Sequence, residues 1–307
     1  MKIPFERTIA GAYRFAFTNI LSVIGIGWFP YLLVAALGVG LAILLYPTAH
    51  GLWLEDRKTI DTAKLVTNIV PLVGAVVLVL LALLVAQAMV TVGLMRKALG
   101  QHPGPVFVFF SLGRQVWQLI GSYVLMVLLV WGGIVLVTLG IGAVGVVLGQ
   151  VAAKAMPVVV GVLAFIAVLG YFYTVLRLSF FIPAVVVAED HIGLRRSWHL
   201  GRGNFWRILG ITLIVSLPVQ LAASTISSTM LQITMGPGLG LQPGPMTDAQ
   251  GQKFVADLFD VARRVGPYYA ILQILYLALL SGLTTGAVAN AYKAVAGEGS
   301  ADTKAVA

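Results

Sequence analysis

The sequence predicts an all-α, polytopic membrane protein with about six transmembrane helices and short interfacial helices. Of its 307 residues, 59% are hydrophobic and only 10% are charged, whereas soluble domains average about 25% charged residues. Six apolar runs each exceed the roughly 20 residues that an α-helix needs to cross a bilayer. The runs are expected to be helical, because lipid cannot satisfy the polar groups of an open backbone.

Each apolar run is bounded by polar or turn-forming residues. A surface helix is predicted over residues 4–19, where apolar side chains recur at helical spacing. The spans are predicted over residues 20–45, 69–95, 117–142, 157–183, 205–226 and 267–289. The third span could continue beyond 142, because glycines recur from Gly132 to Gly149.

The longest connection covers residues 231–266. It begins with Gly-Pro-rich sequence and continues, after Thr247, with an amphipathic helix that lies either in lipid or against the other helices. Residues 1–296 are therefore predicted to form a single integral membrane domain. The small and polar residues 297–307 predict a disordered cytoplasmic tail.

The distribution of basic residues predicts the topology. With the N-terminus inside the cell, about two thirds of the 20 lysines and arginines fall in cytoplasmic segments, so both termini are expected in the cytoplasm, at the inner (plasma) membrane of a bacterium. The same bias accounts for the net charge of +9, and nucleic acid is therefore not an expected partner. The chain has no cysteine, which excludes disulfides and thiolate metal sites.

Residues 177–207 join the fourth and fifth predicted spans and are rich in Arg and Trp. Trp prefers the headgroup layer, and basic residues collect on the cytoplasmic side, so this stretch is expected to form an interfacial elbow. Arg195, His199 and Arg202 follow one another along one stripe of a helix, with Leu194 and Trp198 on the neighbouring face. Such a division suits a helix lying flat on the membrane.

The elbow also resembles a known family. The pattern is similar to the multi-pass membrane domain found with some bacterial glycerophosphodiester phosphodiesterases, although His199 and Gly201 depart from it. The matching positions are Arg177, Pro183, Glu189, Arg196, Ser197, Trp198, Leu200, Arg202, Gly203, Phe205, Trp206 and Arg207. The resemblance implies the membrane part without the enzyme, because catalysis would need a separate barrel domain with acidic metal ligands. We therefore expect no enzyme activity, no cofactor and no metal site.

Two sets of elbow residues are candidate sites. Arg177 lies inside the fourth span, where it either extends its charge to the interface or forms a structural ion pair with Glu189. The second set is predicted to bind the phosphates of anionic phospholipids, although it could instead only anchor the elbow. Its members are Arg195, Arg196, Arg202, Arg207, Trp198 and Trp206.

The spans themselves carry few polar residues. Interhelical hydrogen bonds account for such residues without a substrate, and ion-coupled transport is therefore disfavoured. The polar span residues are Gln87, Thr138, Gln220, Gln273 and Asn290. A stripe of small residues, Ala278, Gly282 and Gly286, predicts close helix packing within the chain or a dimer face, so a homo-oligomer or another membrane protein partner stays open.

Arg followed by an aromatic residue three positions later precedes three spans, at Arg14, Arg114 and Arg202. This spacing suggests three helical hairpins of one plan, although span entries favour such pairs in any case. The sequence thus favours a non-enzymatic membrane protein with a structural, regulatory or lipid-interacting role. The alternative is a transporter or lipid-translocating protein, which a cavity lined by polar groups from several spans would favour.

Overall fold

The computed structural model of the chain describes residues 2–54, 62–102, 104, 106–152, 154–235 and 248–305. These residues form helices and connecting turns, with no strand among them, which confirms the all-α class. The helices are α1 (Phe5–Thr18), α2 (Ile20–Leu54), α3 (Thr62–Ala98), α4 (Arg114–Val151), α5 (Met156–Ser179), α6 (Ile182–Glu189), α7 (Leu194–Leu200), α8 (Phe205–Met235) and α9 (Asp248–Ala305).

The described residues include six stretches long and apolar enough to cross a membrane, as the sequence predicts. These are Ile20–Tyr46, Val66–Ala98, Arg114–Gln150, Met156–Glu189, Phe205–Met230 and Arg264–Ala296. The glycines between Gly132 and Gly149 all lie inside α4, so the third span continues to the end of that helix. The protein is therefore a multi-pass integral membrane protein.

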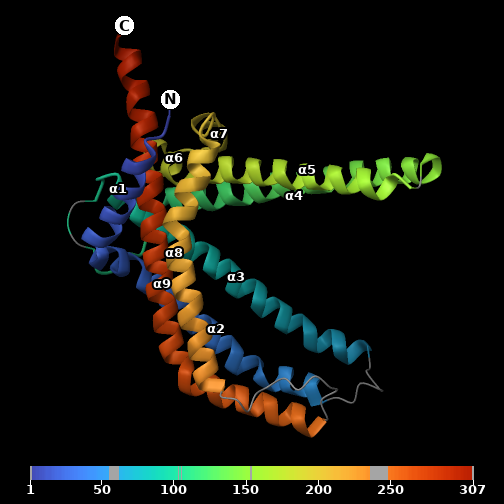
Figure 1. Cartoon of the computed structure of the whole chain (residues 1–307). Coiled ribbons are helices and arrows are strands. Elements are labelled where there is room, and N and C mark those ends of the chain that lie inside the picture. The colour runs from blue at the N-terminus through green and yellow to red at the C-terminus, as the bar shows by residue number, and fades with distance from the viewer. Residues whose placement is uncertain are drawn as a thin grey trace.

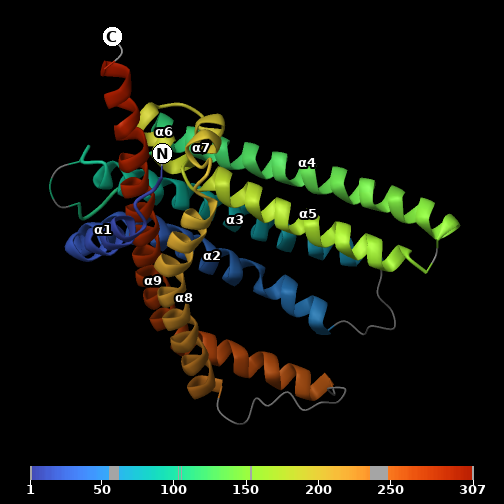
Figure 2. The ribbon, with the colours of Figure 1, turned by 45° about the horizontal axis from the view of Figure 1, so that its top comes forward.

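The long helices pair in chain order as three hairpins: α2 with α3, α4 with α5, and α8 with α9. The hairpins diverge from a shared end that also holds α1, α6 and α7 (Figure 1; Figure 2). We call this end the hub: α1, α6, α7 and the adjoining ends of the six long helices. Away from the hub, most large apolar side chains of α4 and α5 are exposed, as lipid-facing surface requires.

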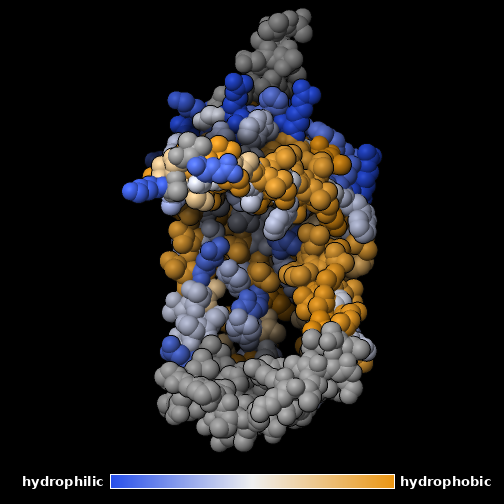
Figure 3. All heavy atoms as spheres, turned by 90° about the vertical axis from the view of Figure 1, so that its right-hand side faces the viewer, coloured by the Kyte–Doolittle hydropathy of each residue, from blue (hydrophilic) through white to orange (hydrophobic). Residues whose placement is uncertain are grey.

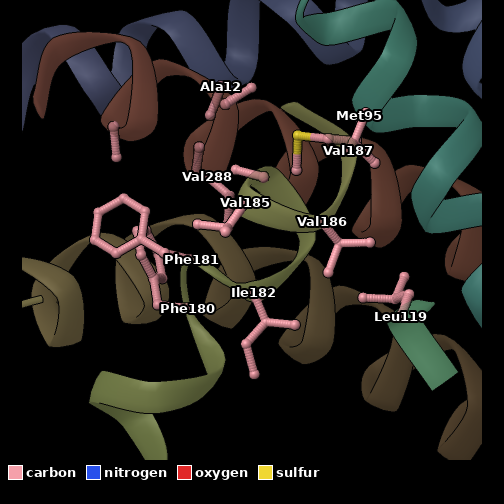
Figure 4. Packing of buried hydrophobic residues seen from close by; sticks show 14 of the residues in the cluster. Ala12, Met95, Leu119, Phe180, Phe181, Ile182, Val185, Val186, Val187 and Val288 are labelled. Carbon is pink, nitrogen blue, oxygen red and sulfur yellow. The ribbon is translucent and has the colours of Figure 1, made fainter. Parts of the chain in front are cut away.

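Helix α6 lies at the centre of the hub. All its residues from Ile182 to Val187 are buried, and they share one hydrophobic core with side chains of α1, α3, α4 and α9 (Figure 4). A helix that is hydrophobic on every side is stable only when it is surrounded. The position of α6 therefore requires the ends of three hairpins to close around it.

The fourth span, Met156–Glu189, consists of two helices and not one. Helix α5 stops at Ser179, a turn at Phe180 and Phe181 follows, and Pro183 lies in the first turn of α6. Proline is tolerated there because its missing N–H would have no partner in the first turn of a helix. Pro183 therefore begins a new helix and does not terminate the span.

The stripe of small residues on α9 packs inside the chain. A Cβ atom built on Gly282 would lie 2.7 Å from Cγ1 of Val23, and one built on Gly286 would lie 3.1 Å from Cα of Ala12. Helices α1 and α2 thus approach the backbone of α9 as closely as glycine allows. Of the two predicted roles of this stripe, packing within the chain is the one observed.

Helix α9 is longer than the sixth predicted span. Its first part runs in a different direction from the rest, and Pro267 inside the helix accounts for the change (Figure 1). This first part includes the predicted amphipathic segment, whereas Thr247 lies outside the described residues. The helix also continues to Ala305, and the disorder expected from residue 297 stays a prediction.

A segment without regular structure, residues 106–113, connects α3 to α4 and packs on α2. The Val106 N–H donates to Oγ of Ser22 over 3.3 Å, and Nε1 of Trp28 donates to the Phe107 carbonyl over 2.8 Å. Phe109 is buried between α2 and α3. Gly25 makes this contact close, since a Cβ there would lie 2.1 Å from the Val106 carbonyl oxygen.

We predict that Gly25→Ala destabilises the protein, because the new methyl group would push residues 106 and 107 off α2. The expected loss is about 1–3 kcal/mol, measured as a lower thermal midpoint of the purified protein in detergent. Gly38→Ala is the matched control in the same helix, since nothing lies within 4 Å of its Cβ position. The control should hold or gain stability, because alanine favours helix over glycine by about 1 kcal/mol. Equal midpoints for the two variants would contradict the packing.

Candidate functional site

The elbow predicted from the sequence, residues 177–207, covers the end of α5, all of α6 and α7, and the start of α8. The seven residues of α7 place Ser197 and Leu200 against the hub and leave Arg195 and His199 exposed. Arg202 lies after the helix, in the turn that leads to α8, and is also exposed. The predicted basic stripe is therefore shared between α7 and the turn that follows it.

Arg177 is buried, with 6% of its surface exposed, and it is not paired with Glu189. Its Nε donates to the Trp198 carbonyl over 3.1 Å, and its Nη1 donates to the Tyr173 hydroxyl over 2.9 Å. The guanidinium carbon also lies 3.7 Å from the centroid of the Trp198 ring. The predicted ion pair is therefore wrong. Arg177 is held by Tyr173 of its own helix and by the ring and carbonyl of Trp198 in α7.

Glu189 faces the other side of the hub. Nε of Arg196 lies 3.2 Å from its Oε1, and the Tyr292 hydroxyl donates to the same oxygen over 2.9 Å. His191 lies 3.9 Å from the second carboxylate oxygen. Glu189 thus joins α6 to α7 and α9, and Arg196 is occupied by this contact.

The C-terminal end of α6 is held by side chains of α4. Nε2 of Gln115 donates to the Val187 carbonyl over 3.2 Å, and Nε2 of Gln118 donates to the Asp190 carbonyl over 3.0 Å. Asp190 adopts the left-handed conformation (φ 52°), which ends the helix, and Arg114 lies 3.5 Å from its carboxylate. These bonds satisfy carbonyls that have no partner within the helix at its C-terminal end.

The start of α8 binds the N-terminus of the chain. The Ile3 N–H donates to Oδ1 of Asn204 over 3.0 Å, and Nη1 of Arg207 donates to the Ile3 carbonyl over 2.7 Å. The Ile3 side chain is fully buried, and Phe5 lies close to Gly210 of α8. Arg207 therefore has a structural partner that was not predicted.

Three of the six residues predicted to bind lipid phosphate are thus engaged inside the protein: Arg196, Arg207 and Trp198. The other three face outward. The side chains of Arg195 and Arg202 form no hydrogen bond or ion pair with any described residue, and Trp206 has 78% of its surface exposed. The structure therefore leaves two arginines and one tryptophan free to contact headgroups.

Several functional contacts were not predicted. Tyr173, Tyr292 and Asn204 each bind an elbow residue or the N-terminus, yet none stands in an unusual pattern of spacing or charge. Their partners are 4, 103 and 201 residues away in the chain. In the described part of the chain no three His, Cys, Asp or Glu side chains lie close enough to hold a metal ion.

We predict that Glu189 is coupled to Arg196 and not to Arg177. In a double-mutant cycle on the free energy of unfolding, Glu189→Gln and Arg196→Gln should show a coupling of about 0.5–1 kcal/mol, because their charges are in contact and partly exposed. The matched cycle of Glu189→Gln with Arg177→Gln should be additive within about 0.5 kcal/mol. Coupling in the second cycle alone would restore the pair that the structure excludes.

Comparisons of the chain with protein-family models, with curated proteins and with solved structures find no match. The resemblance to the membrane domain associated with glycerophosphodiester phosphodiesterases therefore rests on the elbow residues alone. In the structure, those residues join α5, α6, α7, α8 and α9 to one another and hold Ile3.

Proposed function

We propose that the chain is a non-enzymatic protein of the bacterial inner membrane, with both termini in the cytoplasm, whose hub binds anionic phospholipids. The observation that carries this proposal is the pair of exposed arginines, Arg195 and Arg202, which have no partner among the described residues and lie close in sequence to Trp206. The resemblance of the elbow to a membrane domain that also occurs without its enzyme supports the non-enzymatic part. A structural or regulatory role at the membrane would act through the same surface.

The free energy with which this surface attracts anionic lipid can be estimated from its charges. Each basic residue close to an anionic bilayer contributes about 1 kcal/mol, and this contribution falls within a Debye length of roughly 8–10 Å. Two free arginines therefore bias the lipid around the hub by about 2 kcal/mol. The exposed Trp206 suits the same layer, since its ring is apolar and its indole N–H can reach headgroup oxygens.

We predict that purified protein retains phosphatidylglycerol and cardiolipin through Arg195 and Arg202. The variant Arg195→Gln/Arg202→Gln should retain up to about thirtyfold less of these lipids, the equivalent of about 2 kcal/mol, measured by mass spectrometry of the lipids that copurify. The matched control is Lys154→Gln/Arg264→Gln, which removes two exposed charges away from the hub. Equal retention by both variants would leave the elbow with an anchoring role only.

A second function, transport or lipid translocation, is favoured by a separate observation. Figure 3 shows the molecule hollowed between two columns, with hydrophilic residues over α8 and α9 and hydrophobic residues over α2 and α3. Gln220, Ser224 and Ser228 follow one stripe of α8, and all three are exposed within a membrane span. Gln220 has no hydrogen-bond partner in the part of the chain that the structure describes, and such an amide is costly in hydrocarbon. A hydrated or headgroup-filled space beside α8 would remove this cost.

We predict that position 220 is accessible to water inside the membrane. The chain contains no cysteine, so Gln220→Cys introduces one thiol, whose thiolate form reacts with a maleimide only where water reaches it. The matched control is Leu221→Cys, which is exposed at the same depth but lies about 100° further round the helix. Gln220→Cys should react about tenfold faster than the control in native membranes. Equally slow reaction at both positions would exclude a hydrated space beside α8.

A further inference from the structure

The protein holds the guanidinium of Arg177 in one position, but only some of its N–H donors form hydrogen bonds. A guanidinium has five N–H donors, and the structure engages one on Nε and one on Nη1, so three donors stay available. Nη2 donates to no group in the described part of the chain. The ring of Trp198 covers one face of the guanidinium, at 3.7 Å from its centroid to the guanidinium carbon, and Tyr173 lies at its edge.

The charge of Arg177 has no counter-charge within the protein. No Asp or Glu among the described residues forms an ion pair with it, and its neighbour along the elbow, Glu189, is occupied by Arg196 and Tyr292. The Trp198 ring, the Trp198 carbonyl and the Tyr173 hydroxyl stabilise the cation but leave its full charge in place. A buried cation of this kind favours an anion beside its open edge.

The position of Arg177 along α5 indicates which anion it meets. Arg177 lies 21 residues after Met156, the first residue of α5, and 21 residues at about 1.5 Å each span about 31 Å. The hydrocarbon of a bilayer is about 30 Å thick, so a helix that enters the bilayer at Met156 and runs straight across it carries the guanidinium to the level of the headgroup phosphates. Guanidinium binds phosphate through two parallel N–H bonds, which an ammonium group cannot reproduce.

From this geometry we propose that Arg177 is the binding site for a single phosphate group, held by the open edge of a guanidinium that Trp198 and Tyr173 have already oriented. The phosphate belongs either to a phospholipid headgroup or to a soluble phosphate ester that enters from the aqueous side. This site is independent of the proposed function, because Arg195 and Arg202 take no part in it. It differs from a general attraction to anionic lipid in that it binds one molecule with fixed geometry.

The first arm of the test is native mass spectrometry of the purified protein titrated with phosphatidylglycerol. The wild type should bind one lipid that survives collisional activation. Arg177→Lys should need about tenfold more lipid for the same occupancy, because lysine keeps the charge but cannot form two parallel hydrogen bonds to a phosphate. The variant Arg195→Gln/Arg202→Gln is the control and should bind this one lipid as the wild type does. If this double variant binds the one lipid but copurifies with less anionic lipid in total, that loss tests the proposed function and not the Arg177 site.

The second arm uses inorganic phosphate on delipidated protein and follows the thermal midpoint. A rise in the midpoint for the wild type but not for Arg177→Lys assigns the site to soluble phosphate, whereas a lipid effect without a phosphate effect assigns it to the headgroup. Trp198→Leu keeps Arg177 and its carbonyl partner but removes the ring, and it should weaken binding at least about threefold. This variant carries the test if Arg177→Lys does not fold. Binding equal to the wild type in every folded variant, in both arms, would overturn the proposal.

Discussion

The burial of α6 is the constraint on which the rest of the molecule depends. Helix α6 has eight residues, and the six from Ile182 to Val187 are apolar on every side. Such a helix cannot stay folded in water and is too short to cross lipid. They are stable only where other helices surround them, and those helices come from three hairpins and from α1. The hub exists because this short helix must be enclosed, and the divergence of the hairpins beyond it costs little, since lipid covers their apolar faces.

The density of Arg and Trp in the elbow follows from the same constraint. The hairpins diverge beyond the hub (Figure 1), so the contacts that hold them together are concentrated near it. Arg196 and Glu189 join α7, α6 and α9, while Ser197 donates to the Leu178 carbonyl over 2.5 Å and holds α7 on α5. Trp198 covers Arg177 with its ring. Most of the motif thus forms the contacts between elements, and the groups left for ligands outside the chain are the outward-facing arginines and the unused N–H donors of Arg177.

Features that depend on length, composition or helical period could be predicted from the sequence. Six spans follow from apolar runs of sufficient length, and the packing role of Gly282 and Gly286 follows from small residues repeating every four positions. Helix α6 could not be separated from the preceding span, because most of its residues are as apolar as those of α5 and no glycine or run of polar residues marks the turn at Phe180. The partner of Arg177 could not be predicted either, since spacing does not tell which side of α6 carries Glu189. Arg207 binds a backbone carbonyl, and every residue has one, so the sequence does not show which carbonyl it binds.

The docking of Ile3 on the start of α8 has a consequence for biosynthesis. The two contacts that hold Ile3 join residues separated by 201 and 204 positions in the chain. At a synthesis rate of about 5–20 residues per second, roughly 10–40 s pass between the appearance of residue 3 at the ribosome and that of its partners. During that interval the first four transmembrane segments enter the membrane, while Ile3 has no binding site because its partners have not yet been synthesised. Ile3 therefore reaches its final position long after it is made, and the hub closes only after the start of α8 has been synthesised.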